Sequence, residues 1–276
     1  MNRFNRVLNR LVVIIAIFSA ARAIAMDGGV TIEVRPERIV VPLHQPLAAM
    51  LIIHNFSTQA AAVDLGDDRK GNIILTSTLP DGTEQTYFAA PREGLSRIGQ
   101  IEIQSGQTYL QRILLNDWLD FQAVGVYRIE VRLREQITLH DGTVVRTGPL
   151  ALVASVAGPN GEALTSFCRD ALQRLLTSKT YSQAEHAAEE LRYAKDPIAV
   201  PYLSRAFDTP YPVQSLLVTG LERIDTDASI RALLAVTRER PQIAPEAIKQ
   251  ALANLVNRTS DPNLEIQIRQ ALARKM

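Results

Sequence analysis

The residues with the most reactive side chains are few in this chain of 276 residues. It contains four histidines and one cysteine, namely His44, His54, His140, His186 and Cys168. No pair of histidines has the spacing of metal ligands, and a single cysteine excludes both an intrachain disulfide and a cysteine-rich metal site. The sequence therefore predicts no metal-binding residues.

The single cysteine is open to two interpretations. An accessible thiol could act as a nucleophile or form an intermolecular disulfide, whereas a buried thiol serves as a small apolar side chain. Cys168 lies four residues after Leu164 and four before Leu172, so the three residues share one face of a helix. We favour the buried role.

Motifs for nucleotide binding or covalent catalysis are absent from the sequence. It contains no G-x-S-x-G, no Walker loop and no G-x-G-x-x-G. Residues 64–70 include three aspartates, but these lack the regular ligand spacing of a calcium loop, and we interpret them as solvated loop charge. We predict no catalytic residues and no cofactor. A hydrolase whose site is assembled in space between domains stays open as an alternative.

The N-terminus has the three parts of a secretory signal peptide. Three arginines within the first ten residues precede the apolar run of residues 11–18, and Ala23-Ile24-Ala25 matches the A-x-A cleavage pattern. The run is far shorter than the roughly 20 residues that span a bilayer. We predict that residues 1–25 are removed and that the mature chain is exported to the periplasm or the extracellular space, without membrane insertion.

The charge balance bears on the class of partner. The formal net charge is +1, and the predicted signal peptide holds four arginines and no acid, so the mature chain would carry −3. This balance does not supply the basic surface that nucleic acids or anionic membranes require. The partner that we expect is another protein.

Residues 26–157 show the alternation of apolar and polar residues that is typical of β-strands. The clearest strand contains Tyr127, Ile129, Val131 and Leu133. Further strands are expected at 30–35, 47–55, 62–65, 73–77, 109–115, 137–139 and 144–145, with hairpin turns at Asp81-Gly82 and Asp141-Gly142. Because no helical crossover separates these strands, the pattern favours an antiparallel β-sandwich.

Two aromatic residues refine this prediction. Tyr127 follows Gly125 at the start of the clearest strand, where the hydroxyl of a tyrosine corner would bond to upstream backbone. Trp118 could be a platform that stacks on a ligand or could close one end of the sandwich. Its apolar neighbours Leu119 and Phe121 favour the buried, closing role.

The run from Pro46 to Leu65, with two strands around a polar loop, resembles the immunoglobulin-like domains of bacterial exported proteins. It is also loosely similar to the BsuPI-type proteinase-inhibitor sandwich. The resemblance spans about 110 residues and implies an immunoglobulin-like fold. It keeps open a second function, namely protease inhibition through a sandwich loop.

Residues 158–161, Gly-Pro-Asn-Gly, separate this region from a helical one. Beyond them, at residues 162–276, the apolar period changes from two to 3.6. We expect a capping box at Ser182 and helix starts at Asp196-Pro197, Asp225 and Asp261-Pro262. The spacing of the last three starts is typical of two-helix repeats.

The segment 196–224 resembles a HEAT repeat. It has the acid-proline start of the first helix, a Val-x-x-Leu pattern within that helix, and a second helix that ends in Leu-x-x-Ile. Residues 225–257 are similar to a second, weaker copy. The resemblance implies a stack of helical hairpins with a concave face, and a plain helical bundle is the alternative.

The resemblance also implies where a partner would bind. The second helices of a HEAT-like stack, here about residues 212–224 and 244–257, line its concave face. The polar positions outside their apolar stripes are expected to face solvent: Gln214, Thr219, Glu222, Arg223, Lys249, Gln250 and Asn254. All of them except Thr219 are the candidate protein-binding residues.

The function predicted from these observations is that of an exported, non-enzymatic protein-binding or scaffold module. It would act through the concave helical-repeat face and the sandwich loops. The alternatives are the protease inhibitor and the envelope hydrolase described above.

Overall fold

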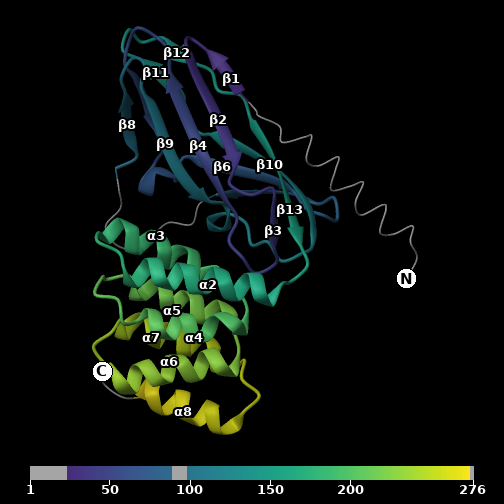
Figure 1. Cartoon of the computed structure of the whole chain (residues 1–276), viewed down its shortest axis with the longest axis vertical. Helices are drawn as coiled ribbons and strands as arrows, with labels where there is room; N and C mark the ends of the chain where they lie inside the picture. The colour runs from purple at the N-terminus through teal and green to yellow at the C-terminus, as the bar shows by residue number, and fades with distance from the viewer. Residues whose placement is uncertain (1–23, 89–97, 274–276) are drawn as a thin grey trace, which may run out of the picture. The chain divides into compact units, whose positions relative to one another are not determined.

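A computed structural model of the chain describes residues 24–88 and 98–273. The chain divides into two compact units. One contains the described residues up to Leu43 together with Leu47–Gly158, and the other contains His44–Pro46 and the described residues from Pro159 onward. The first unit is built of β-sheets and the second of helices (Figure 1). Most of the predicted signal peptide, residues 1–23, lies outside the described residues.

The strands of the first unit form three sheets. The strands are β1 (Ile24–Asp27), β2 (Val30–Pro36), β3 (Val40–Pro42), β4 (Ala48–Asn55), β5 (Ala61–Asp64), β6 (Ile73–Thr78), β7 (Glu84–Phe88), β8 (Gln100–Ile103), β9 (Thr108–Leu114), β10 (Gly125–Leu133), β11 (Ile137–Leu139), β12 (Val144–Val145) and β13 (Leu150–Ala157). The orders are β1-β2-β4-β9, β3-β13-β10-β6-β7 and β12-β11-β5-β8. Strand β1 includes Ile24 and Ala25, so the predicted cleavage site lies within it.

The predicted antiparallel arrangement has one exception among the described strands. Neighbouring strands are antiparallel except β3 and β13, which pair in parallel with Ser155 opposite Val40 and Val156 opposite Val41. A hairpin forces antiparallel pairing, but these two strands are separated by most of the unit. Their relative direction is therefore not set by a local turn.

One apolar core joins the three sheets. Alternate residues along each strand point to opposite faces, and the inward set is almost fully buried. Ile32 of β2, Ile129 of β10 and Ile137 of β11, one from each sheet, belong to a single cluster and are at most 1% exposed. The period-two pattern of the sequence is therefore the pattern of this core.

Tyr127 and Trp118 are both buried in the β unit. The Tyr127 hydroxyl donates to the carbonyl oxygen of Ala123 at 3.0 Å and accepts from the Ala123 N–H at 3.1 Å, which confirms the tyrosine corner. Trp118 is buried, and its indole N–H donates to the carbonyl oxygen of Ile73 at 2.9 Å. A buried indole that is hydrogen-bonded in this way is part of the core and does not offer a ligand platform.

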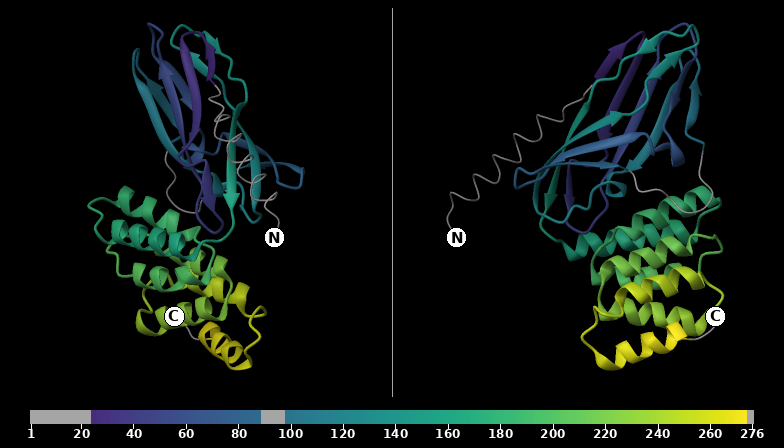
Figure 2. Two further views of the ribbon diagram at one scale, coloured as in Figure 1. Left: turned by 45° about the vertical axis from the view of Figure 1, so that its right-hand side comes forward. Right: turned by 180° about the vertical axis from the view of Figure 1, so that it is seen from behind.

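Seven α-helices follow Gly158 in the described part of the chain. They are α2 (Gly161–Leu176), α3 (Tyr181–Arg192), α4 (Val200–Ala206), α5 (Gln214–Ile224), α6 (Asp227–Glu239), α7 (Pro245–Leu255) and α8 (Pro262–Ala273). Helices α2, α4, α6 and α8 pack in succession as one row, and α3, α5 and α7 pack as a second row. Figure 2 shows the resulting stack from two further sides.

Capping residues explain most of the helix starts. The side chains of Asn160 and Asp196 accept backbone N–H groups at the first turns of α2 and of the 3-10 turn Pro197–Ala199 before α4. The predicted capping box at Ser182 is wrong: α3 begins one residue earlier, and Thr180 is its cap. Likewise Thr226, rather than Asp225, caps α6, through a reciprocal pair of hydrogen bonds with Ser229.

One glycine sets how closely the helices approach. A Cβ atom at Gly220 of α5 would lie 2.9 Å from a methyl group of Leu203 in α4 and 3.1 Å from the Cα of Arg192 in α3. No larger residue fits there without a shift of the neighbouring helices. Gly220 therefore allows α5 to pack closely against both α3 and α4.

Candidate protein-binding surface

The predicted binding residues lie on two adjacent helices of the second row. Gln214, Glu222 and Arg223 belong to α5, whereas Lys249, Gln250 and Asn254 belong to α7. Because α5 and α7 pack against each other, the two sets border one another across the helix pair. We call these six residues the α5–α7 surface.

Three of the six residues form one hydrogen-bonded line across the two helices. The Asn254 side-chain amide donates to the carboxylate of Glu222 at 2.7 Å, and the Gln250 amide donates to the Asn254 side-chain oxygen at 3.1 Å. Gln250 and Asn254 are exposed, and Glu222 is half-buried. The line therefore presents a carboxylate, which accepts hydrogen bonds, and two amides, which donate and accept them.

Arg223 lies in a different environment from the predicted one. Its guanidinium stacks over the ring of Tyr193, and that of Arg192 lies over the same ring. Arg223 is half-buried, and Tyr193 is only 5% exposed. The expectation that Arg223 faces solvent is wrong, because stacking on an aromatic face in the helix junction competes with hydration.

The remaining predicted residues are half-buried. Lys249 lies 3.6 Å from the carboxylate of Glu246 one turn earlier, and Gln214 begins α5. Thr219 donates its hydroxyl to the Ser215 carbonyl oxygen at 3.0 Å, within its own helix. Of the seven positions expected to face solvent, the structure exposes Gln250 and Asn254 fully.

Arg192 and Tyr193, at the end of α3, lie beside this surface and were not predicted from the sequence. Arg192 donates to the Tyr193 hydroxyl at 2.6 Å, and the two residues adjoin Arg223. The breaker Asp196-Pro197 shortly afterwards indicates that a helix ends nearby, but no periodicity reveals which neighbour Tyr193 contacts. Its role depends on the packing of α3 against α5.

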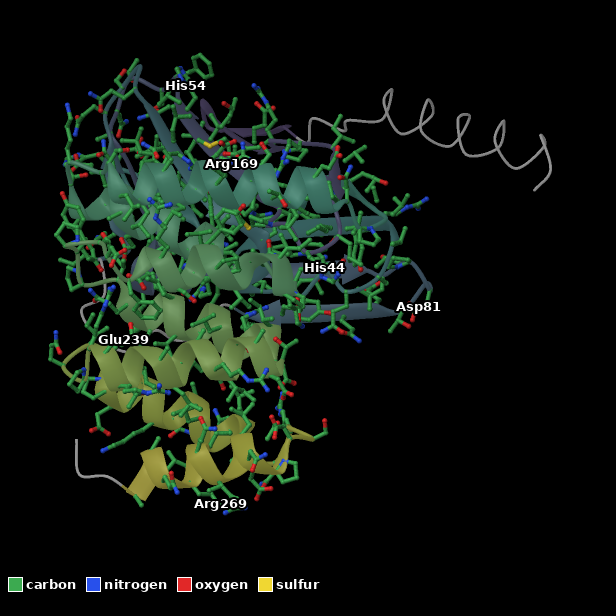
Figure 3. The ribbon with its side chains drawn as sticks, turned by 60° about the horizontal axis from the view of Figure 1, so that its bottom comes forward. His44, His54, Asp81, Arg169, Glu239 and Arg269 are labelled. Carbon is green, nitrogen blue, oxygen red and sulfur yellow. The ribbon has the colours of Figure 1, made fainter. Side chains whose placement is uncertain are left out.

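The α5–α7 surface contains three amides, one carboxylate and two cations. The amides can donate and accept hydrogen bonds, the carboxylate accepts them, and the cations donate them. Charged side chains are also spread along the helical unit: Arg169, Glu239 and Arg269 lie on different helices (Figure 3). Among the described residues, no group of three or more His, Cys, Asp or Glu is placed to hold a metal ion.

Cys168 takes the buried role that we favoured. It is 0% exposed, within the apolar core of the helical unit. Burial raises the pKa of its thiol to about 12, and the charge of Asp196 adds to this effect. Such a thiol is neutral at physiological pH and is a poor nucleophile.

The loop of residues 64–70 uses its charges within the β unit. The Asp64 carboxylate accepts the Gly66 N–H at 2.8 Å, and the Lys70 ammonium pairs with Asp117. His54, the histidine of β4, packs against Phe56 with ring centroids 3.7 Å apart and ring planes tilted by 48°, and it contacts the Thr108 hydroxyl. These contacts are structural.

Comparisons with known proteins do not assign a family. No family model and no curated protein matches the chain. Similar solved structures include a CARDB domain from Pyrococcus furiosus, with 11% identity over 50% of this chain and 97% of that one and a TM-score of 0.26. They also include a β-glucosidase from Listeria innocua, with 14% identity over 46% of this chain and 16% of that one, and the same TM-score. These scores are too low to support an argument about fold or function.

No described helix combines the length and the apolarity that a bilayer-spanning helix needs.

Proposed function

We propose that this chain is an exported, non-enzymatic module that binds another protein, with the α5–α7 surface as the main contact. The observation that carries the proposal is the hydrogen-bonded line of Glu222, Asn254 and Gln250, which combines donors and acceptors on two helices that pack together. A line of this kind suits a polar interface whose geometry is already set before binding. The predicted signal peptide supports export.

We infer that the β unit is an immunoglobulin-like sandwich. The order β2-β4-β9 corresponds to strands A, B and E of that fold, and β13-β10-β6 corresponds to G, F and C. The tyrosine corner of Tyr127 and the core shared by the three sheets support this inference. The loops at the ends of such a sandwich form a second surface on which a partner could bind.

We infer also that the helical unit is a HEAT-like stack rather than a plain bundle. Three polar links join α5, the residue that follows it and the first residue of α6 to α7 and the segment after α7. Their sequence separations are 32 or 33 residues: Glu222 to Asn254, Asp225 to Arg258, and Asp227 to Thr259. A constant separation is what a repeat of that length produces. The two rows of helices agree with stacked hairpins.

A site-specific crosslinking experiment tests the binding surface. A photoreactive amino acid replaces Gln250 or, in a second variant, Asn254, and the crosslinked protein is identified by mass spectrometry after irradiation of the producing cells. A matched control places the same group at Gln173, an exposed residue of α2 in the other row. We expect one partner to be captured from positions 250 and 254 and not from 173. Capture of the same proteins from all three positions would contradict the proposal.

A second candidate function, protease inhibition, rests on Phe56. This side chain is 64% exposed in a turn that Asn55 holds. The fully buried Asn55 amide donates to the carbonyl oxygens of Gln59 and Ile103 at 2.7 and 2.9 Å and accepts from Ser57. A rigid turn that presents one aromatic side chain lowers the entropic cost of binding in a protease pocket.

A protease panel tests this second function. We expect inhibition only of proteases with a deep apolar specificity pocket, and we expect it to be lost in Phe56→Ala but kept in Phe88→Ala, which removes another exposed phenylalanine of the same unit. An absence of inhibition across the panel would remove this candidate.

A further inference from the structure

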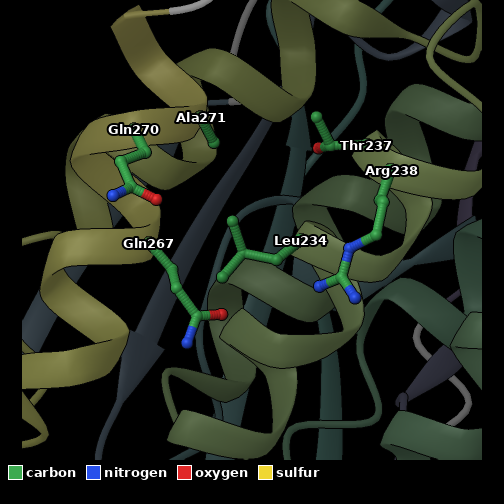
Figure 4. A pocket seen from close by; sticks show the side chains of 6 residues that line it. All are labelled: Leu234, Thr237, Arg238, Gln267, Gln270 and Ala271. Carbon is green, nitrogen blue, oxygen red and sulfur yellow. The ribbon is translucent and has the colours of Figure 1, made fainter.

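A small hollow lies between α6 and α8, in the row of helices opposite the α5–α7 surface. Its volume is about 120 Å³, and it is lined by Leu234, Thr237, Arg238, Gln267, Gln270 and Ala271. Leu234 and Ala271 are buried and form an apolar floor, whereas Arg238, Gln267 and Gln270 are exposed. Figure 4 shows Leu234 between the side chains of Gln267 and Arg238.

Arg238 is the charged group of this hollow. Other arginines of the same region have acidic partners: Arg231 lies 2.9 Å from Asp261, Arg240 lies 2.6 Å from Asp208, and Arg269 lies 2.7 Å from Glu265. Arg238 makes no ion pair or hydrogen bond with its side chain among the described residues, and no acid lines the hollow. Its guanidinium therefore offers up to five N–H donors to an anion.

The size and lining of the hollow restrict the class of ligand. Sites for whole small molecules have volumes of about 300–1,000 Å³, so this hollow suits a single side chain. A guanidinium binds a carboxylate through two parallel hydrogen bonds, and the amides of Gln267 and Gln270 add donors beside it. The apolar floor favours a side chain in which a short run of methylene groups precedes the charged group.

We propose that the hollow between α6 and α8 receives the side chain of a glutamate from a protein partner. The carboxylate binds to Arg238, with the amides of Gln267 and Gln270 as further donors, and the two methylene groups of the glutamate pack on Leu234 and Ala271. The hollow is separate from the α5–α7 surface. A glutamate can therefore bind in the hollow without a partner bound to the α5–α7 surface.

Nuclear magnetic resonance of the intact chain tests the proposal with two small peptides. The probe is N-acetyl-Ala-Glu-Ala-amide, and its neutral counterpart carries Gln in place of Glu. We expect the glutamate peptide to shift the side-chain N–H signals of Arg238, Gln267 and Gln270 in a saturable way. We expect the neutral peptide to bind about tenfold more weakly, because charge-assisted hydrogen bonds are lost. Raising the salt from about 0.05 to about 0.5 M should also weaken binding of the glutamate peptide.

Two variants separate the site from general attraction to positive charge. Arg238→Gln should weaken binding of the glutamate peptide about tenfold, whereas Arg205→Gln, which removes an exposed arginine of α4 outside the hollow, should leave it unchanged. Both variants should keep the thermal midpoint of the wild type. Equal binding of the two peptides, equal weakening by the two variants, or equally tight binding of acetate would overturn the proposal.

Discussion

The guanidinium carbon of Arg223 lies over the ring of Tyr193, 4.7 Å from the ring centroid. This contact joins the last turn of α5 to the residue that follows α3. Tyr193 is buried, so the stacked guanidinium is part of the junction between two helices as well as a neighbour of the proposed binding surface. A substitution at Arg223 therefore acts on folding, and this residue is unsuitable for a test of binding alone.

Charge reversal at Arg223 should destabilise the helical unit. In Arg223→Glu a carboxylate replaces the cation over the ring. The variant loses the cation–π attraction, and the new negative charge lies against the negative face of the ring. We expect the free energy of unfolding to fall by at least about 1 kcal/mol. Urea denaturation measures this loss. Arg205→Glu, at an exposed residue of α4, is the control, and equal midpoints for the two variants would contradict the assignment.

Removal of the Tyr127 hydroxyl should destabilise the β unit. Tyr127→Phe leaves the Ala123 N–H and carbonyl oxygen without their side-chain partner. We expect a loss of about 1–2 kcal/mol in the free energy of unfolding, which the fluorescence of Trp118, the single tryptophan, can report in a urea titration. Tyr87→Phe, whose hydroxyl bonds to Gln85 on an exposed strand, should change stability far less. A loss of similar size in both variants would count against the corner.

The thiol of Cys168 should react only after unfolding. Because it is fully buried and its pKa is raised to about 12, the thiolate is scarcely formed in the native protein near pH 8. We expect iodoacetamide to label the unfolded chain in concentrated urea rapidly and the native chain at least about a hundredfold more slowly. Rapid labelling of the native chain would show that the helical unit opens easily or that the thiol is accessible.

The contribution of Asp261 should depend on pH. Its carboxylate accepts the N–H groups of Leu264 and Asn263 at the start of α8 and pairs with Arg231, and these contacts lower its pKa below the usual 3.8. A lowered pKa means that the stabilisation is complete above pH 3.8 and is lost as the pH falls through the folded-state value.

Thermal midpoints measured between about pH 7 and pH 3 test this dependence. Asp261→Ala should melt below the wild type at neutral pH, and the gap between them should shrink in acid. Asp170→Ala, which alters an exposed aspartate within α2, serves as the control. A gap that is constant with pH would mean that the charge of Asp261 does not contribute.

The predicted cleavage should remove residues 1–25. Ile24 and Ala25 pair with Glu33 and Ile32 in the described sheet, so cleavage would shorten β1 to Met26 and Asp27. Intact-mass measurement of the exported protein should give the mass of a chain that begins at Met26. An exported protein that keeps its first 25 residues would contradict the prediction.

The sequence by itself determined where several strands and helices form, although β3, β7, β8 and β13 were not predicted from it. Alternation marked β2, β4 and β10, and the 3.6-residue period marked α5 and α7, because burying one face of an element needs only residues that are near one another in the chain. The same locality explains the cap at Asp196, which bonds to an N–H two residues away. It also explains the error at Ser182, because Thr180 is a second N-cap residue two positions earlier, and its side chain accepts the N–H of Gln183.

Only the tertiary structure decided which of these elements meet. The parallel pairing of β3 with β13, the stacking of Arg223 on Tyr193, and the hollow of Arg238 and Gln267 each join residues that are about 30 or more apart in the chain. No period encodes such pairs, since each contact depends on how whole helices and strands pack over their shared core. The type of each residue determines which functional group it carries. The neighbours that surround the residue in the fold determine whether that group is accessible.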